Sequence, residues 1–87
     1  MIDEEGQRHL HRTLMEVIQN QIRESNPPET EATLERLLAE GFSRQEAMDL
    51  IGQVLAAEIF EVMKDQREYD QEKYVNRLHD LPQLPED

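Results

Sequence analysis

The chain carries a few polar side chains on helical patterns where they could do chemistry. His9 and His11 are two residues apart, so at about 100° per residue they point to roughly opposite sides of a helix and cannot chelate one ion. His11 and Gln21 both fall inside an apolar arc of their own segment. The apolar members of that arc are Leu10, Leu14, Val17, Ile18 and Ile22. Glu58 projects from the middle of the apolar face of a later helix.

These three positions predict a buried polar cluster of His11, Gln21 and Glu58. An unpaired buried carboxylate is costly, and an imidazole that meets Glu58 where the two helices pack would satisfy it. Gln21 is expected to be a core amide that satisfies a backbone group. The alternative for Glu58 is a place at the edge of the core, from which its carboxylate extends to water.

The sequence contains none of the motifs that carry common catalytic chemistry. It has no Gly-rich phosphate loop, no nucleophile elbow, no His-Glu-x-x-His pair and no zinc-ligand spacing. A hydroxyl nucleophile would have to be Ser25, Ser43 or a threonine, and Ser43 is better explained as a helix cap. We therefore expect no catalytic residue and no required cofactor, and the chain is more readily explained as a protein that is not an enzyme.

Proline, glycine and the apolar periodicity divide the chain into the helices of an all-α, four-helix bundle-like domain. The first helix must end before Pro27 and Pro28, because proline lacks an N–H donor and restricts the residue before it. We expect helices over residues 3–24, 28–40, 44–66 and 70–80. The third is long and central, and Asp70 is the expected N-cap of the fourth. We expect residues 1–87 to form a single domain, in which 81–87 are a frayed tail.

The stretch EGFSRQEA, between the second and third helices, has the chemistry of a helix joint. Gly41 suits the left-handed position after a helix, and Phe42 can pack back against the last turn. Ser43 is the expected N-cap of the next helix, and Glu46 completes a capping box with it. The aromatic ring therefore supports the end of one helix and the start of the next.

The third helix is apolar over well more than half of its circumference, which predicts cover on two sides. One face carries Ala47, Leu50, Ile51, Val54, Leu55 and Val62. The opposite face carries Met48, Gly52, Ala56, Ile59, Phe60 and Met63. Gly52 and Ala56 are small residues one turn apart, which would let a second helix approach closely. We therefore predict a homodimer with its interface on this second face. The alternative is cover by the fourth helix and the N-terminal turn of the same chain.

Charge and composition limit the partners and the compartment. Nine basic against twenty acidic residues give a formal charge of −11, which repels phosphate backbones, so no nucleic-acid binding is expected. No stretch approaches about 18 consecutive apolar residues and the N-terminus lacks the pattern of a signal peptide, so no membrane association is expected. The absence of cysteine suits a cytoplasmic protein.

Four segments together resemble the helical region of a bacterial family of uncharacterised proteins. They are HRTLMEVIQNQI, NPPE, RQEAMDLIGQVLAAEIFEVM and YDQEKYVNRL. Members of that family show His-x-x-x-His before a Pro-Pro break, His-Glu-Ala-x-His on the long later helix and a closing Asp-x-x-x-Tyr. The matching residues here are His11, Gln21, Pro27, Pro28, Glu46, Ala47, Asp70 and Tyr74. Met15, Gln45 and Asp49 stand where the family has its other histidines. The resemblance implies the helical fold and carries no established activity.

This resemblance also implies a metal-binding alternative. Paired histidines on neighbouring helices have the geometry to hold a divalent ion. Here His11 would act with Asp49, or with Glu46 or Glu58 as the carboxylate ligand. One histidine, one carboxylate and a thioether from Met15 make a poor ligand set, so a divalent metal is the second hypothesis.

The stretch EGFSRQEA is also similar to the first loop of ubiquitin-associated domains, with Gly41, Phe42 and Ala47 at the matching positions. That local resemblance implies a peptide or protein binder that uses Gly41 and Phe42. It departs in two ways, because Glu40 replaces the usual methionine and the helix after the loop is much longer. The leading hypothesis is therefore an acidic, non-catalytic interaction or assembly module of a bacterial family, which self-associates through its third helix.

Overall fold

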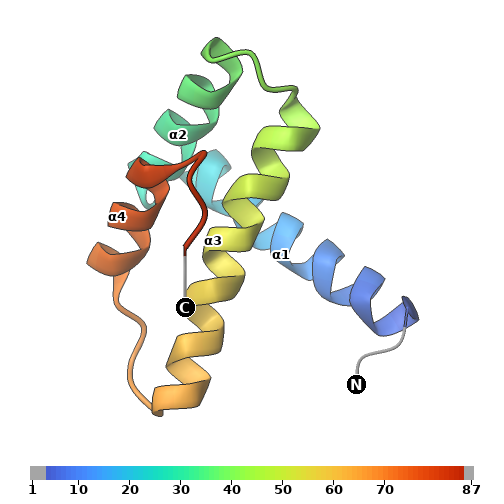
Figure 1. Ribbon diagram of the computed structural model, residues 1–87, viewed down its shortest axis with the longest axis vertical. Helices are drawn as coiled ribbons and strands as arrows, with labels where there is room; N and C mark the ends of the chain where they lie inside the picture. Colours follow the sequence, from blue (N-terminus) through green and yellow to red (C-terminus); the bar gives the residue numbers. More distant parts are fainter. Residues whose placement is uncertain (1–3, 86–87) are drawn as a thin grey trace.

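The structure is a computed structural model that describes residues 4–85, and this range contains four α-helices (Figure 1). They are α1 (Glu4–Glu24), α2 (Pro28–Ala39), α3 (Arg44–Asp65) and α4 (Gln71–Asp80). The predicted all-α, four-helix class is confirmed, and each described boundary lies within one residue of its expected position. The predicted helix start at Asp3 lies outside the described residues. None of the described helices is long and apolar enough to cross a membrane.

α3 runs through the middle of the molecule and contacts each of the other three helices (Figure 1). α2 and α4 lie along one side of it, and α1 crosses behind it. Beyond the crossing, the N-terminal half of α1 and the C-terminal half of α3 diverge. α3 is therefore enclosed near the crossing and more open toward its C-terminal end.

Apolar side chains from all four helices meet in one core around α3. The buried members are Ile18, Leu34, Leu37, Ala47, Met48, Ile51, Val54, Leu55, Tyr74, Leu78 and Leu81. Partly buried side chains pack against them, and these are Leu14, Met15, Ile22, Phe42 and Leu50. Full burial of one large apolar side chain stabilises the fold by about 1.5–3 kcal/mol, so this cluster is the main source of stability.

The joint between α2 and α3 has the predicted capping chemistry. Gly41 adopts the left-handed region with φ of 103°, and the Phe42 backbone N–H donates to the Leu37 carbonyl at 3.1 Å. The Ser43 hydroxyl accepts from the Glu46 N–H at 3.0 Å, and the Glu46 carboxylate accepts from the Ser43 N–H at 2.8 Å. The predicted left-handed position of Gly41 and the capping box of Ser43 and Glu46 are therefore confirmed.

α4 is short, and both of its ends are capped by side chains. Asp70 is its N-cap, as predicted, and its carboxylate accepts from the Lys73 N–H at 3.2 Å. At the other end, the Arg36 guanidinium of α2 donates to the carbonyls of Leu78 and Leu81, at 3.1 and 2.8 Å. The cation satisfies carbonyls that the end of a helix leaves without a partner, and it joins α4 to α2.

The prediction that the frayed tail begins at residue 81 is corrected by Leu81. Its side chain is buried in the core, and the Gln83 N–H donates to the Asp80 carbonyl at 2.9 Å. The chain then turns back toward α3, where Pro85 lines a hollow together with Phe60 (Figure 1). Residues 86 and 87, which belong to the predicted tail, lie outside the described range.

Candidate interaction surface

The most exposed apolar side chains of α3 gather on its C-terminal half. Ile59 is 40% exposed, Phe60 64% and Met63 73%. Ala56 is partly buried and lies one turn before Phe60. Residues three and four apart are neighbours on a helix surface, so these four side chains form one apolar strip. We call Ala56, Ile59, Phe60 and Met63 the exposed α3 face.

The N-terminal part of the predicted interface is covered within the chain. Met48 belongs to the core. Gly52 is also buried, and a Cβ placed there would lie 2.7 Å from Met15 Cε and 3.7 Å from Ile18 Cδ1. α1 of the same chain therefore makes the close helix approach that the small residues were expected to offer a second subunit. This corrects the predicted interface at Met48 and Gly52.

Two hollows border the exposed α3 face. The α1–α3 groove has a volume of about 310 Å³ and is lined by His11, Leu14, Met15, Asp49, Gly52, Gln53 and Ala56. The tail hollow has a volume of about 460 Å³ and is lined by Gln53, Ala56, Ala57, Phe60, Glu61, Lys64, Arg77 and Pro85. Gln53 and Ala56 line both, so they form the ridge between the two depressions, two turns and one turn, respectively, before the protruding Phe60.

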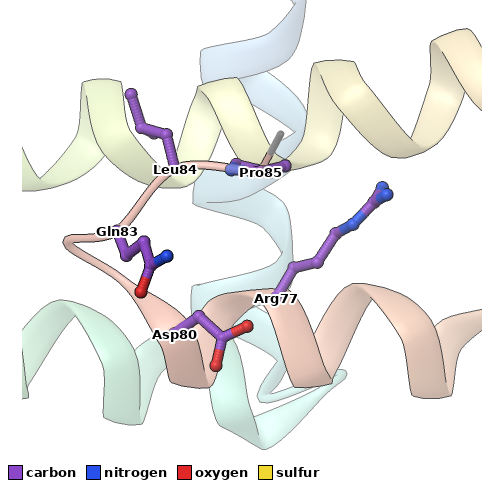
Figure 2. Close-up of a pocket in the computed structure, with 5 residues that line it drawn as sticks. All are labelled: Arg77, Asp80, Gln83, Leu84 and Pro85. Atoms are coloured by element: carbon purple, nitrogen blue, oxygen red, sulfur yellow. The ribbon is translucent and has the colours of Figure 1, made fainter. Parts of the chain in front are cut away.

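A third hollow, between α4 and the tail, has a volume of about 250 Å³ (Figure 2). Figure 2 shows Arg77 reaching from α4 toward α3, with Leu84 and Pro85 of the tail beside α3. Asp80 also lines this hollow, and Arg77 already forms an ion pair with Glu61. Because the guanidinium is neutralised from within the chain, the hollow is poorly suited to an anionic ligand.

Glu58 is the most deeply buried charged side chain of α3, with no exposed surface. Its Oε2 accepts from Arg67 Nη1 at 2.9 Å and from the Asp70 backbone N–H at 3.3 Å. Its Oε1 lies 3.6 Å from Arg77 Nη1, which is an ion pair without a hydrogen bond. The hydrogen bond and ion pair with Glu58 raise the pKa of the Arg67 guanidinium. Glu58 therefore ties α3 to the segment before α4 and to α4 itself.

Glu61, one turn further along α3, continues this network. It accepts from Lys73 Nζ at 2.9 Å and pairs with Arg77. Hydrogen bonds first from Lys73 and then from Arg77 lower the pKa of the Glu61 carboxyl below its ordinary value. The sequence prediction missed the three cations that contact Glu58 and Glu61, which are Arg67, Lys73 and Arg77. Lys73 and Arg77 flank the inward Tyr74 at positions one turn apart, and that spacing was the available signal.

The predicted cluster of His11, Gln21 and Glu58 is divided among three places. His11 is exposed, and its Nε2 lies 3.8 Å from Asp49 Oδ1. Gln21 Oε1 accepts from the Thr30 hydroxyl at 2.8 Å and from the Tyr74 hydroxyl at 2.9 Å. The expected contact between His11 and Glu58 is therefore wrong, and Gln21 satisfies two side chains where a backbone partner was expected.

Tyr74 connects α4 to the joint between α1 and α2 through this Gln21 contact. Its ring is fully buried, and Tyr69 lies against it with ring centroids 6.2 Å apart. Burial raises the pKa of the Tyr74 hydroxyl to about 12, because the phenolate would lose its hydration. The buried hydroxyl is thus held as a neutral hydrogen-bond donor.

Of the residues that the metal-binding alternative requires, the structure brings only His11 and Asp49 together. His11 and Asp49 lie together at the α1–α3 groove, as that alternative required. Glu46 is engaged in the capping box and Glu58 in the arginine network. Among the side chains that the structure describes, no group of three or more His, Cys, Asp or Glu is placed to hold an ion.

The stretch that resembles the first loop of ubiquitin-associated domains has a structural role in this fold. Phe42 is partly buried and packs against the core. Its backbone holds the end of α2, which leaves Gly41 as the exposed residue of the pair. The packing of Phe42 and the conformation of Gly41 are both explained by the connection between α2 and α3.

Comparisons with known proteins give no further guide to this surface. No family model, curated protein or solved structure matches the chain. A functional inference must therefore come from the exposed side chains and their surroundings.

Proposed function

We propose that the protein is a non-catalytic assembly module that forms a homodimer through the exposed α3 face. The observation that carries this proposal is the adjacent exposure of Ile59, Phe60 and Met63 at 40%, 64% and 73%. Scattered single apolar residues are normal on protein surfaces, whereas a contiguous group of large ones is typical of an interaction site. Phenylalanine and methionine are also enriched in the centres of protein interfaces.

The surroundings of this face support a helix-mediated contact. α1 has diverged from α3 at this level, and α4 is held on another side of α3 by Glu58 and Glu61 (Figure 1). A small domain buries a modest share of its surface, so a second copy adds stability that its own core lacks. The two depressions on either side of Ala56 and Gln53 give an incoming side chain a place to be buried.

Size-exclusion chromatography with light scattering tests the proposal on matched variants. Phe60→Gln removes the central apolar side chain, while Leu38→Gln removes a 40% exposed leucine from α2 as the control. We expect a dimer for the wild type and for Leu38→Gln, and dissociation that is at least about tenfold easier for Phe60→Gln. Equal dissociation of both variants, or a wild type that remains monomeric at high micromolar concentration, would overturn the proposal.

A further inference from the structure

We propose that the two copies pair with their α3 helices antiparallel, about a two-fold axis that meets the exposed α3 face midway between Ala56 and Phe60. This inference rests on the proposed function and adds the register of the partner. Residues at equal distances on the two sides of the axis then face each other. Phe60 of one copy lies over Ala56 of the other, and Met63 lies over Gln53.

Shape on the exposed α3 face favours this register. Phe60 and Met63 protrude, whereas the partly buried Ala56 and the neighbouring Gln53 form the ridge between the α1–α3 groove and the tail hollow. The antiparallel register brings each protruding side chain of one copy over the ridge of the other, beside the two depressions that border it, in both directions. A parallel pair would instead set Phe60 against Phe60 and Met63 against Met63, with both depressions left unfilled, and unfilled apolar space is destabilising.

Charge selects the same direction. Asp49 lies N-terminal to the face and Lys64 lies C-terminal to it, and both are at least partly exposed. With about 1.5 Å of rise per residue, Lys64 is about 9 Å and Asp49 about 13.5 Å from the axis, an offset within the reach of a lysine side chain. The antiparallel pair therefore sets Lys64 of each copy beside Asp49 of the other. A parallel pair would set Lys64 beside Lys64 and Asp49 beside Asp49.

Cross-linking tests the register directly, because the chain contains no cysteine. Gln53→Cys and Met63→Cys are prepared separately, one of them with a mass label, and treated with a short bifunctional maleimide alone and after mixing. The antiparallel register predicts a cross-linked product that joins the two variants in the mixture, and little product for either variant alone. Product from Met63→Cys alone that matches the mixture would overturn the register.

Light scattering on the same samples separates the two proposals. Dimers without a link between positions 53 and 63 would overturn the register and leave the homodimer standing. Monomeric wild type would overturn both.

Charge reversal gives a second test that does not depend on cysteine variants. At an ionic strength that screens the net charge, Lys64→Glu and Asp49→Lys should each weaken the dimer by about three- to tenfold, since each removes two exposed ion pairs and sets like charges together. The double variant should recover most of the wild-type affinity. Singles without effect, or a double variant that loses the sum of both effects, would overturn the register.

Discussion

Glu58 and Arg67 form an ion pair in which the carboxylate has no exposed surface, with Glu58 Oε2 and Arg67 Nη1 2.9 Å apart. The pair lies where the chain leaves α3 and approaches α4. Arg77 and Lys73 of α4 contact Glu58 and Glu61, so the same network holds α4 on one side of α3. The exposed α3 face lies on another side, where α1 has diverged from the helix (Figure 1).

Glu58→Gln should strongly destabilise the fold. The amide cannot neutralise Arg67 and Arg77, and loss of a hydrogen bond between charged groups costs more than about 1 kcal/mol. Urea unfolding followed by circular dichroism measures the change. Glu35→Gln, at an exposed position of α2, is the control and should change the unfolding free energy by less than about 0.5 kcal/mol. Equal midpoints for the two variants would show that the network does not stabilise the fold.

Glu61 should make the unfolding free energy decrease as the pH falls below 4.5. Its pKa in the folded protein is lowered from the ordinary value of 4.5, chiefly by Lys73 and then by Arg77. Its contribution is therefore fully present above pH 4.5 and is lost as the pH falls through the lower, folded value. Unfolding free energies of the wild type and Glu61→Gln should converge as the pH falls through that window. A constant difference across the window would contradict this role of Glu61.

Tyr74 should make the unfolding free energy decrease as the pH rises above 10.0. Its pKa is raised from the ordinary value of 10.0 to about 12, so its contribution is complete below pH 10.0 and is lost as the pH rises toward 12. Ultraviolet titration of the Tyr69→Phe variant follows Tyr74 alone and should show a midpoint well above that of free tyrosine. Titration at the free value in the folded protein would mean that the ring is accessible to water.

Substitutions at Gly52 test whether this residue packs against α1 of its own chain or against a second copy. Alanine at position 52 gains about 1 kcal/mol of helix propensity but pushes Met15 Cε, which is the flexible end of a side chain, so Gly52→Ala should stay within about 1 kcal/mol of wild-type stability. Gly52→Leu cannot be accommodated beneath α1 and should destabilise the monomer by more than about 2 kcal/mol. Thermal unfolding at several protein concentrations measures both. If Gly52→Leu weakened dimerisation and left the stability of the monomer unchanged, Gly52 would belong to the interface between copies.

Salt should strengthen the dimer. Each copy carries a formal charge of −11, so two copies repel each other at long range, and added salt screens this repulsion more than it weakens the buried apolar contact. Sedimentation velocity at increasing sodium chloride concentration should therefore show a growing dimer fraction. Dissociation by salt would indicate that ion pairs dominate the contact.

The parts of the fold that could be predicted are those with local causes. Gly41, Ser43 and Glu46 act within a few residues of one another, and Asp70 caps the helix that directly follows it. Such signals need no knowledge of how helices are arranged in space. The four helices and their ends could be read from the sequence for this reason.

The parts that could not be predicted depend on where the helices cross. His11 lies on the apolar arc of α1 but two turns before the buried Ile18, and it is exposed beside Asp49. Glu58 was expected to be buried, yet its cation comes from Arg67 beyond the end of its own helix. The apolar strip of α3 is similarly continuous in sequence, while α1 covers it at Gly52 and leaves it open at Phe60.

The most direct test of the account is sedimentation equilibrium on the wild-type chain over a range of concentrations. Self-association through the exposed α3 face predicts a reversible shift from 10.3 kDa toward twice that mass, and its loss in Phe60→Gln at unchanged circular dichroism. A mass of 10.3 kDa at every concentration up to high micromolar would contradict self-association through the exposed α3 face.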